Sequence, residues 1–307
     1  MIARKNKIGK VLIIDGHAIL HRAYHALPFL SGRGGKPTNA IYGFYSMLLS
    51  VIKEAGPHWL IICLDAPGPN FRHQQFVGYQ AKRPPMEESL ASQIRPFKKS
   101  LARANLVVFS KSGFEADDLI GTICQKIKKK KIVKKIVVVT GDKDLMQLVD
   151  KKVNLLVPGK GISQLNQYDP EKVEQVLGIK PSQVIDYKAL MGDPSDNYPG
   201  VTGIGPKTAA DLLQKYQNLA QVYNHCGELS ENMRRKLKSD KKSAYLSRKL
   251  AEVKVDVPIK VNLKKAVFGK KMIEDIRGSL EEYNFRSLVK RLDREYNLEK
   301  ETQMKLI

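Results

Sequence analysis

Residues 10–17 read KVLIIDGH, an apolar run that closes on Asp15 and Gly16. Four more apolar runs follow, none of them strictly alternating with polar residues, at 59–64, 106–109, 136–140 and 153–157. Segments with helical spacing lie between the runs, at 39–54, 87–105 and 115–130. Apolar strands separated by helices predict an α/β fold, in which helices cover both faces of a parallel sheet.

The second half of the chain has a different pattern. Strand signals vanish from about residue 169, and helical segments follow at 170–177, 181–191, 206–216 and 241–253. Three of these segments begin with a proline, which is well tolerated at the first position of a helix. We therefore predict an α/β domain at 1–175, a helical domain at 176–292 and a C-terminal tail at 293–307.

The charge of the chain is its most unusual bulk property. It has 53 Lys and Arg against 31 Asp and Glu, a formal charge of +22 over 307 residues. Such an excess favours a nucleic-acid partner over an anionic membrane surface, although a generally lysine-rich proteome would also produce it. The run KIKKKKIVKK at 126–135 is interpreted as a solvated helix end, with direct DNA contact as the alternative.

The cysteines and the N-terminus bear on location. Cys63, Cys124 and Cys226 are far apart and form no CxxC motif, which fits a reducing compartment. The apolar run near the N-terminus is too short for a signal peptide or a membrane span. We therefore expect a soluble, cytoplasmic protein associated with the nucleoid.

Acidic residues gather in five short clusters, and several of them close an apolar run. The nine residues are Asp15, Asp65, Glu115, Asp117, Asp118, Asp142, Asp144, Asp193 and Asp196. Each cluster alone is explained by a turn or a helix start, but carboxylates brought together at the carboxyl ends of strands would repel without bound cations. Oxygen ligands select Mg²⁺ or Mn²⁺ over zinc, and two such ions about 4 Å apart support phosphodiester hydrolysis. The pattern predicts metal-dependent chemistry on a nucleic acid.

A second metal site is conceivable at His17, His21 and His25, which are spaced i, i+4 and i+8. On one continuous helix they would share a face and could bind a transition metal. Pro28 and the turn at Asp15 leave little room for a long helix, so we favour packing or hydrogen bonding near the first loop.

The stretch GVTGIGPKTA at 200–209 has the composition of a phosphate-binding loop. Pro206 rules out a Walker A loop, and Thr208 stands where a dinucleotide fingerprint needs glycine. A glycine-rich turn between helices instead predicts a helix-hairpin-helix, whose backbone N–H groups from Val201 to Gly205 hold a DNA phosphate, with charge from Lys207. A plain inter-helix turn is the alternative.

The segment at 70–85, NFRHQQFVGYQAKRPP, mixes aromatic and basic residues. Aromatic rings with interleaved cations are typical of contact with single-stranded nucleic acid, by stacking and phosphate pairing. The residues alone are equally compatible with a loosely packed surface loop.

Together these motifs resemble the bacterial 5′-nuclease family, the 5′→3′ exonuclease domain of DNA polymerase I and the related flap endonucleases. The similarity runs from about Val11 to Leu292 and rests on ordered motifs. They are IIDGHAILHRAYHAL, CLDAPGPNFRH, RPPM, GFEADDLIGT, TGDKDLMQLV, ALMGDPSDNYPGVTGIGPKTA and AYLSRKLA. The resemblance implies a monomeric enzyme that cuts DNA with a free 5′ end (a flap, a nick or an RNA-primed end) and works beside a DNA polymerase.

The resemblance also implies roles for individual residues. Two or more Mg²⁺ or Mn²⁺ ions would be held, the first by Asp15, Asp65, Glu115 and Asp117, the second by Asp118, Asp142, Asp144, Asp193 and Asp196. Arg72, Lys82 and Arg83 would act on the reacting strand from an arch at about 70–104. DNA would contact His21, Arg22, Phe71, Tyr79, Gly200, Val201, Gly203, Ile204, Gly205, Lys207 and Thr208, with a potassium ion at the hairpin.

Three departures from the family pattern stand out. Gln80 occupies the position of an arch lysine that faces the scissile phosphate, a role that Lys82 could take over. His21 replaces a tyrosine, and the chain ends at Ile307, as expected of a stand-alone nuclease or of a fragment of a longer polymerase. The rival functions are a catalytically weakened branched-DNA-binding paralogue and a PIN-like ribonuclease.

Overall fold

The computed structural model describes residues 8–159 and 164–297. Its centre is a six-stranded sheet in the order β3-β2-β1-β4-β5-β6. The strands are β1 (Gly9–Asp15), β2 (Trp59–Cys63), β3 (Val107–Phe109), β4 (Val133–Val139), β5 (Val153–Pro158) and β6 (Leu165–Tyr168). All neighbours pair in parallel except β5 and β6, which are antiparallel. The predicted α/β fold is therefore confirmed.

Helices cover both faces of this sheet, as the buried, non-alternating strands require. On one face, Val11 and Ile13 of β1 pack with α5 (Ala116–Ile127). On the other, Leu12 and Ile14 pack in a core shared with α2 (Asn39–Ala55) and α4 (Glu88–Arg103). The alternation of β1 side chains thus divides the interior into two cores.

The carboxyl edge of the sheet carries the loops that matter for function. Asp15 ends β1 and caps α1 (Gly16–Ala26), accepting a hydrogen bond from the Ala18 N–H. The helix α3 (Phe71–Gln75) follows β2, and the 3₁₀ helix η2 (Lys143–Leu148) follows β4. Parallel strands therefore deliver their following residues to a single edge, where ligand sites of such sheets form.

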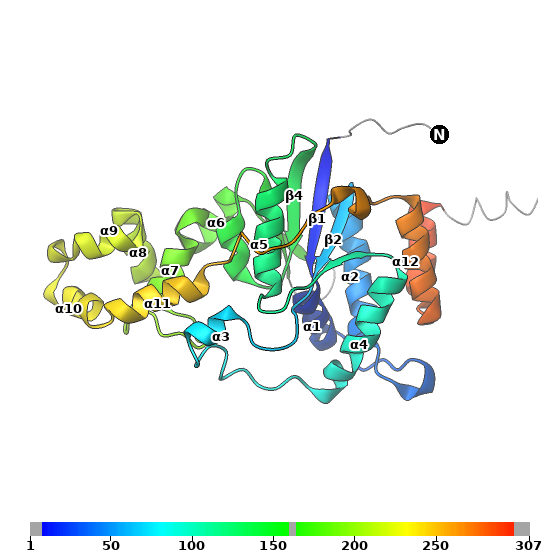
Figure 1. The fold of residues 1–307 in the computed structure, drawn as a ribbon, viewed down its shortest axis with the longest axis horizontal. Coiled ribbons are helices and arrows are strands. Elements are labelled where there is room, and N and C mark those ends of the chain that lie inside the picture. Colours follow the sequence, from blue (N-terminus) through cyan, green and yellow to red (C-terminus); the bar gives the residue numbers. More distant parts are fainter. Residues whose placement is uncertain (1–7, 160–163, 298–307) are drawn as a thin grey trace, which may run out of the picture.

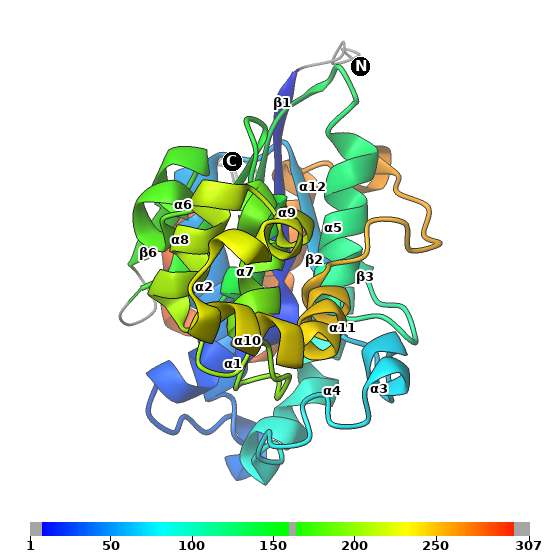
Figure 2. The ribbon, with the colours of Figure 1, turned by 90° about the vertical axis from the view of Figure 1, so that its left-hand side faces the viewer.

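A helical region extends from the sheet on the α5 side (Figure 1). It contains α6 (Pro170–Leu177), η3 (Pro181–Gln183), α7 (Val184–Met191), α8 (Pro206–Tyr216), α9 (Leu219–Asn224), η4 (Cys226–Glu228), α10 (Glu231–Ser239) and α11 (Lys241–Ala251). Figure 2 shows α7 to α11 in front of the sheet, with α3 and α4 below them. Their apolar residues continue the core on the α5 face.

The last helices return to the opposite face of the sheet. After η5 (Leu263–Ala266) come α12 (Lys270–Glu282) and α13 (Arg286–Tyr296), at the far side from α8 to α11 in Figure 1. Ile276 and Leu292 lie in the same core as α2 and α4. The predicted 176–292 domain therefore includes a segment that packs on the α/β core, and residues 298–307 of the predicted tail lie outside the described residues.

Several expectations about elements need correction. A long helix at 16–26 was not expected, yet α1 spans these 11 residues, because Pro28 lies beyond its end. The polar strand β6 and the helices α3, α9, α10, α12 and α13 were not predicted either. No helix in the part of the chain that the structure describes is long and apolar enough to cross a membrane.

Candidate active site

A cavity of about 1280 Å³ opens at the carboxyl edge of the sheet. Eight of the nine predicted carboxylates line it, and only Asp118 does not. They reach the cavity from the ends of β1, β2 and β4, from the start of α5 and from the loop after α7. Residues that are up to 181 positions apart in the chain, Asp15 and Asp196, therefore share one site.

The carboxylates near β1 are buried and repel one another. Burial and the neighbouring Asp65 raise the pKa of Asp15 to about 7. A hydrogen bond of 2.8 Å from the Thr140 hydroxyl lowers this pKa, but not enough to offset the rise. Burial and the carboxylates of Asp142 and Asp15 raise the pKa of Asp117 well above its usual range. Such raised pKa values show that negative charge gathers here without enough compensation.

Asp65 and Glu115 differ in how far their neighbours offset the effect of burial on the pKa. Burial alone would raise the pKa of Asp65, but hydrogen bonding with His17 and from the Ala116 N–H, at 2.8 Å, lowers it. The pKa of Glu115 is raised to about 7 by burial, although the Arg72 guanidinium opposes the shift. Two carboxylates in one cavity thus have opposite protonation tendencies.

Lys188 on α7 was missed by the sequence analysis. Its ammonium lies 2.6 Å from an Asp144 oxygen and also pairs with Asp193. The pKa of Asp144 still rises to about 7, through burial and repulsion from Asp142, whereas Lys188 helps to lower that of Asp193 despite burial. Nothing in the spacing of ALMGDPSDN signals this lysine, because its role depends on the packing of α7 against η2.

The donor set suits hard divalent cations, since it consists of carboxylate oxygens in a cavity with excess negative charge. Among residues 8–159 and 164–297, however, no three His, Cys, Asp or Glu side chains are arranged to hold one metal ion as they stand. Protein cations already hold four of the eight cavity carboxylates: Lys188 holds Asp144 and Asp193, Arg83 holds Asp196, and Arg72 holds Glu115. The residues present fit divalent cations in chemistry and charge, with rotation of these side chains.

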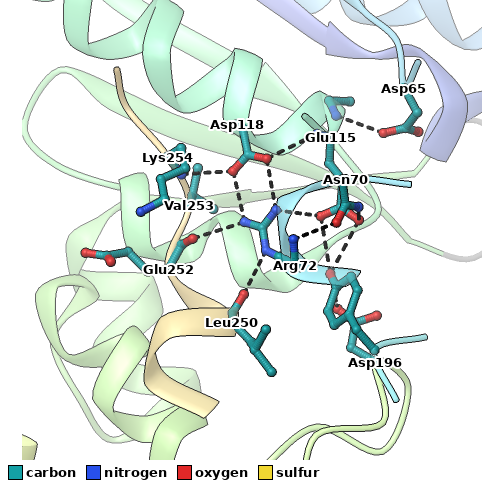
Figure 3. A network of polar contacts seen from close by, with 12 residues as sticks. Asp65, Asn70, Arg72, Glu115, Asp118, Asp196, Leu250, Glu252, Val253 and Lys254 are labelled. Carbon is teal, nitrogen blue, oxygen red and sulfur yellow. Dashed lines mark hydrogen bonds and ion pairs between the residues drawn. The ribbon is translucent and has the colours of Figure 1, made fainter. Parts of the chain in front are cut away.

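Arg72 and Asp118 form a separate, buried network (Figure 3). Two guanidinium nitrogens of Arg72 donate to the two oxygens of Asp118, each at 2.9 Å, and a third contact of 2.8 Å reaches Glu115. Arg72 also donates to the carbonyl of Leu250, in the last turn of α11 (Lys241–Ala251), and to that of Glu252, just after it. Asp118 is fully buried and Arg72 is 3% exposed.

This network involves three residues to which the resemblance assigns roles. The Asp118 carboxylate is outside the cavity and is saturated by Arg72 and by the N–H groups of Glu115 and Lys254. Arg72 cannot reach a strand in the arch while it is buried in this pair. Phe71 was expected to contact DNA, but its ring lies against the Arg72 guanidinium, 4.5 Å from the centroid, and does not line the cavity.

The remaining arch residues lie at the rim. The Tyr79 hydroxyl donates to Asp196 at 3.1 Å and to Glu115 at 3.2 Å, and the ring is only 3% exposed. Gln80, at a left-handed φ of 56°, donates from its amide to Glu115 at 3.1 Å. Arg83 lines the cavity with a side chain that is 51% exposed, whereas Lys82 is exposed outside it.

The three histidines of α1 do not form a metal site. His17 accepts a hydrogen bond from the Asp65 N–H at 2.9 Å, which supports the interpretation that it bonds near the first loop. His21 and His25 contact each other one turn further on, and both line the cavity together with Arg22. The unexpected length of α1 makes this pair possible.

The predicted hairpin lies between α7 and α8. Gly200 and Gly203 have φ values of 66° and 75°, and a side chain at Gly200 would meet the Gly192 nitrogen at 2.2 Å. The Val201 N–H donates to the Leu190 carbonyl, and the Ile204 N–H donates to the Val201 carbonyl. The Thr202 N–H donates to the Asp240 carboxylate at 2.7 Å. These groups are therefore not free for a phosphate, contrary to expectation.

Other donors of the hairpin remain available. No backbone partner is recorded, among the described residues, for the N–H groups of Gly203 and Gly205. Lys207 and Thr208 lie in the first turn of α8, where helix N–H groups also lack partners, and Lys207 is exposed. An anion would therefore meet the hairpin at Gly203, Gly205 and the start of α8.

Known proteins share both halves of this arrangement. Residues 10–178 match the family model of the 5'-3' exonuclease N-terminal resolvase-like domain, and residues 179–301 match that of the 5'-3' exonuclease C-terminal SAM fold. The sheet, its acidic cavity and these matches define a nuclease. The chain belongs to the 5'-3' exonuclease family, which confirms the resemblance seen in the sequence.

Curated relatives are bacterial DNA polymerases. DNA polymerase I of Caldicellulosiruptor bescii is 36% identical over 288 residues, 92% of this chain and 33% of that protein. The thermostable DNA polymerase I of Thermus thermophilus is 35% identical over 284 residues, again 92% of this chain and 33% of that protein. The chain thus spans about a third of the length of the curated relatives it matches.

Solved structures share the fold at lower identity. T5 5'-exonuclease with bound divalent metal ions (zinc) has a TM-score of 0.66 at 21% identity, covering 89% of this chain and 98% of that one. The catalytic core of Rad2 in complex with a DNA substrate has a TM-score of 0.57 at 16% identity, covering 94% and 90%. These likenesses confirm the fold of the α/β core together with the helical region.

Proposed function

We propose that the chain is a structure-selective 5′→3′ exonuclease and 5′-flap endonuclease, which hydrolyses DNA phosphodiester bonds with two or more bound divalent cations. The observation that carries this proposal is the cavity with eight carboxylates in a chain of charge +22. Acidic side chains at one edge of a basic protein suit cations held against a polyanion. The metal-bound T5 structure and the DNA-bound Rad2 structure support the proposal of divalent cations and a DNA substrate.

The carboxylates would divide into two groups. Asp15, Asp65, Glu115 and Asp117 would hold one cation, and Asp142, Asp144, Asp193 and Asp196 would hold the second. Bound Mg²⁺ or Mn²⁺ supplies an activated water and stabilises charge on the phosphate oxygens. Asp118 drops out of the second group because Arg72 already neutralises it.

The other residues would position the DNA. Arg83, at the rim, can leave Asp196 for a phosphate oxygen of the reacting strand, since both are strong acceptors of guanidinium hydrogen bonds. His21, Arg22 and Tyr79 line the route along the cavity. The hairpin donors at Gly203, Gly205, Lys207 and Thr208 would hold the duplex, with a potassium ion at the hairpin and Lys82 outside the cavity as an auxiliary cation.

We further propose that this nuclease acts as a monomer in primer removal and repair, in the cytoplasm at the nucleoid, beside a DNA polymerase. The curated relatives named DNA polymerase I support the link to replication. Residues 1–175 would form the catalytic domain, with the arch at about 70–104, and residues 176–292 would carry the duplex-binding hairpin.

Cleavage of matched flap substrates tests the proposal. DNA and RNA 5′ flaps on the same DNA duplex are incubated with the full chain in Mg²⁺ or in EDTA, with a flapless duplex as control. We expect Mg²⁺-dependent cutting near the junction of the DNA flap. Cutting of single-stranded RNA without regard to a junction would instead support the PIN-like ribonuclease, and binding without any cutting would support the weakened paralogue.

A further inference from the structure

The part of the cavity that α1 and α4 line, here called its basic end, takes no part in the proposed metal chemistry. It is lined by His21, Arg22 and His25 of α1 and by Ile94 and Lys98 of α4. The carboxylates reach the cavity from strand ends, from α5 and from the loop after α7, whereas the basic end collects imidazoles and cations from α1 and α4. A ligand that spans the cavity would therefore meet groups of opposite charge.

The two imidazoles at this end are in direct contact. The Nε2 atoms of His21 and His25 are 3.4 Å apart, and the ring centroids are 4.5 Å apart. Only one proton can lie between two such nitrogens, so protonating both rings places like charges side by side. Partial burial and then the neighbouring His25 lower the pKa of His21.

The groups that face this pair have mixed charge. Arg83 also lowers the pKa of His21, and Glu87 raises it. Glu87 is already engaged, because it accepts a hydrogen bond of 2.7 Å from the Tyr24 hydroxyl. Lys98 lines the cavity from α4 and forms no ion pair within the described residues.

Arg22 independently indicates that a ligand binds near the histidine pair. Its Nε–H is buried and has no hydrogen-bond partner among the described residues. A buried donor left without an acceptor is costly, so such a group signals an acceptor that comes from outside. Arg22 is one residue from His21 and lines the same end of the cavity.

We propose that this basic end binds the terminal 5′-phosphate of the strand, and that the His21–His25 pair takes up a proton when the phosphate binds. The inference rests on the proposed function, because it needs a 5′ DNA end in the cavity. A phosphate monoester carries between one and two negative charges near neutral pH and offers three strong acceptor oxygens. Arg22 and Lys98 supply fixed positive charge, and the histidine pair becomes positively charged when it is protonated.

The pH dependence has a definite sign. Binding of the anion favours the charged imidazolium, so affinity gained through the pair is present at low pH and is lost as the pH rises through the pKa of the bound pair. The phosphate itself titrates in the opposite sense, since its second pKa is about 6 and its charge grows with pH. The pair and the phosphate are therefore distinguishable by the direction of the change.

Binding to matched ends tests the proposal without any catalysis. A duplex with a one-nucleotide flap, ending in a 5′-phosphate or a 5′-hydroxyl, is titrated with the full chain in EDTA at pH 6, 7 and 8. Fluorescence anisotropy from a label on the other strand gives both Kd values, and their ratio cancels effects common to both ends. We expect the phosphorylated end to bind about tenfold tighter at pH 6, with the ratio falling toward pH 8.

Variants separate the pair from the permanent cations. His21→Asn with His25→Asn should abolish the fall of the ratio with pH, leaving a ratio that is flat or rises. His225→Gln, which removes an exposed histidine from the helical region, should behave like the parent. Equal affinities for both ends at every pH, or a falling ratio that survives in the double variant, would overturn the inference. If neither end binds, the proposed function fails as well, whereas tight binding of both ends alike leaves it intact.

Discussion

At the scale of single residues, the cavity is a balance between carboxylates and the few protein cations that touch them. Lys188 is largely enclosed: its side chain is 16% exposed, beside Asp144 at 15% and Asp193 at 8%. It neutralises charge that divalent cations would otherwise neutralise. The same ammonium therefore stabilises the protein without metal and competes with metal for the carboxylates.

Lys188→Met is expected to lower the free energy of unfolding of the metal-free protein by about 2 kcal/mol, because two enclosed carboxylates lose their partner. Added Mg²⁺ should restore much of this loss, so its thermal shift should be larger in the variant than in the parent. Lys172→Met removes an exposed lysine of α6, outside the cavity, and serves as the control in the same thermal denaturation. Equal Mg²⁺ shifts in parent and Lys188→Met would contradict this role.

The resemblance places Gln80 where we expect a lysine of the arch, and its amide contacts Glu115 and Asp196. Gln80→Lys should raise the rate of cleavage, above all the release of the terminal nucleotide, because a flexible ammonium stabilises charge that develops on the phosphate. Turnover should change more than binding.

The neutral variant Gln80→Met is the control for this change, compared by single-turnover kinetics. Lys82→Ala tests the alternative that the neighbouring lysine already supplies the cation. An inactive Lys82→Ala, together with no gain in Gln80→Lys, would assign the role to Lys82.

At the scale of elements, Arg72 ties three segments together. It lies on α3, pairs with Asp118 on α5, and donates to the carbonyls of Leu250 at the end of α11 and of Glu252 after it. These contacts hold the base of the arch against both the sheet and the helical region. Its position within the sequence NFRH suggested a surface role, since burial of an arginine depends on a distant partner.

Arg72→Leu should lower the free energy of unfolding by about 3–5 kcal/mol, because Asp118 would remain buried and unpaired. Arg103→Leu, which removes an exposed arginine beside Glu282, should cost less than about 1 kcal/mol. Urea denaturation measures both. An Arg72→Leu protein that keeps the parent's stability but loses DNA binding would contradict this structural role. That result would support the expectation that Arg72 contacts the DNA strand.

The hairpin is the second element with its own prediction. Lys207→Ala should weaken duplex binding about equally across sequences and reduce the slope of log affinity against log salt by about one phosphate contact. Lys129→Ala, in the basic run beyond α5, should leave the slope unchanged if that run is only solvated. An unchanged slope in Lys207→Ala would make the hairpin a plain turn between helices.

The elements differ in how far local sequence patterns determine them. β1, β2 and the acidic residues after them were predictable, because buried parallel strands have continuous apolar runs and deliver their loops to one edge. β6 was not, since its residues LNQY carry little apolar signal. Lys188 and the Arg72–Asp118 pair depend on contacts between segments far apart in the chain, which local patterns do not encode.

At the scale of the whole molecule, the notable feature is the separation of charge. A chain of net charge +22 concentrates eight carboxylates in one cavity, and burial raises the pKa of Asp15, Glu115 and Asp144 to about 7. Under the proposed function, the basic exterior would attract DNA, whereas the acidic cavity would repel a phosphate unless cations enter. Binding and cleavage should therefore respond differently to loss of one carboxylate.

The most direct test uses Asp142→Ala, with flap binding and single-turnover cleavage measured on the same protein. The account predicts that the parent cuts a 5′ flap in Mg²⁺ and not in EDTA, and that the variant loses at least about a hundredfold in rate. Flap binding by the variant should stay equal or become tighter, because one repulsive charge is gone, and Asp275→Ala on α12 should resemble the parent. An Asp142→Ala protein that cuts the flap at a rate near the parent's would contradict the account.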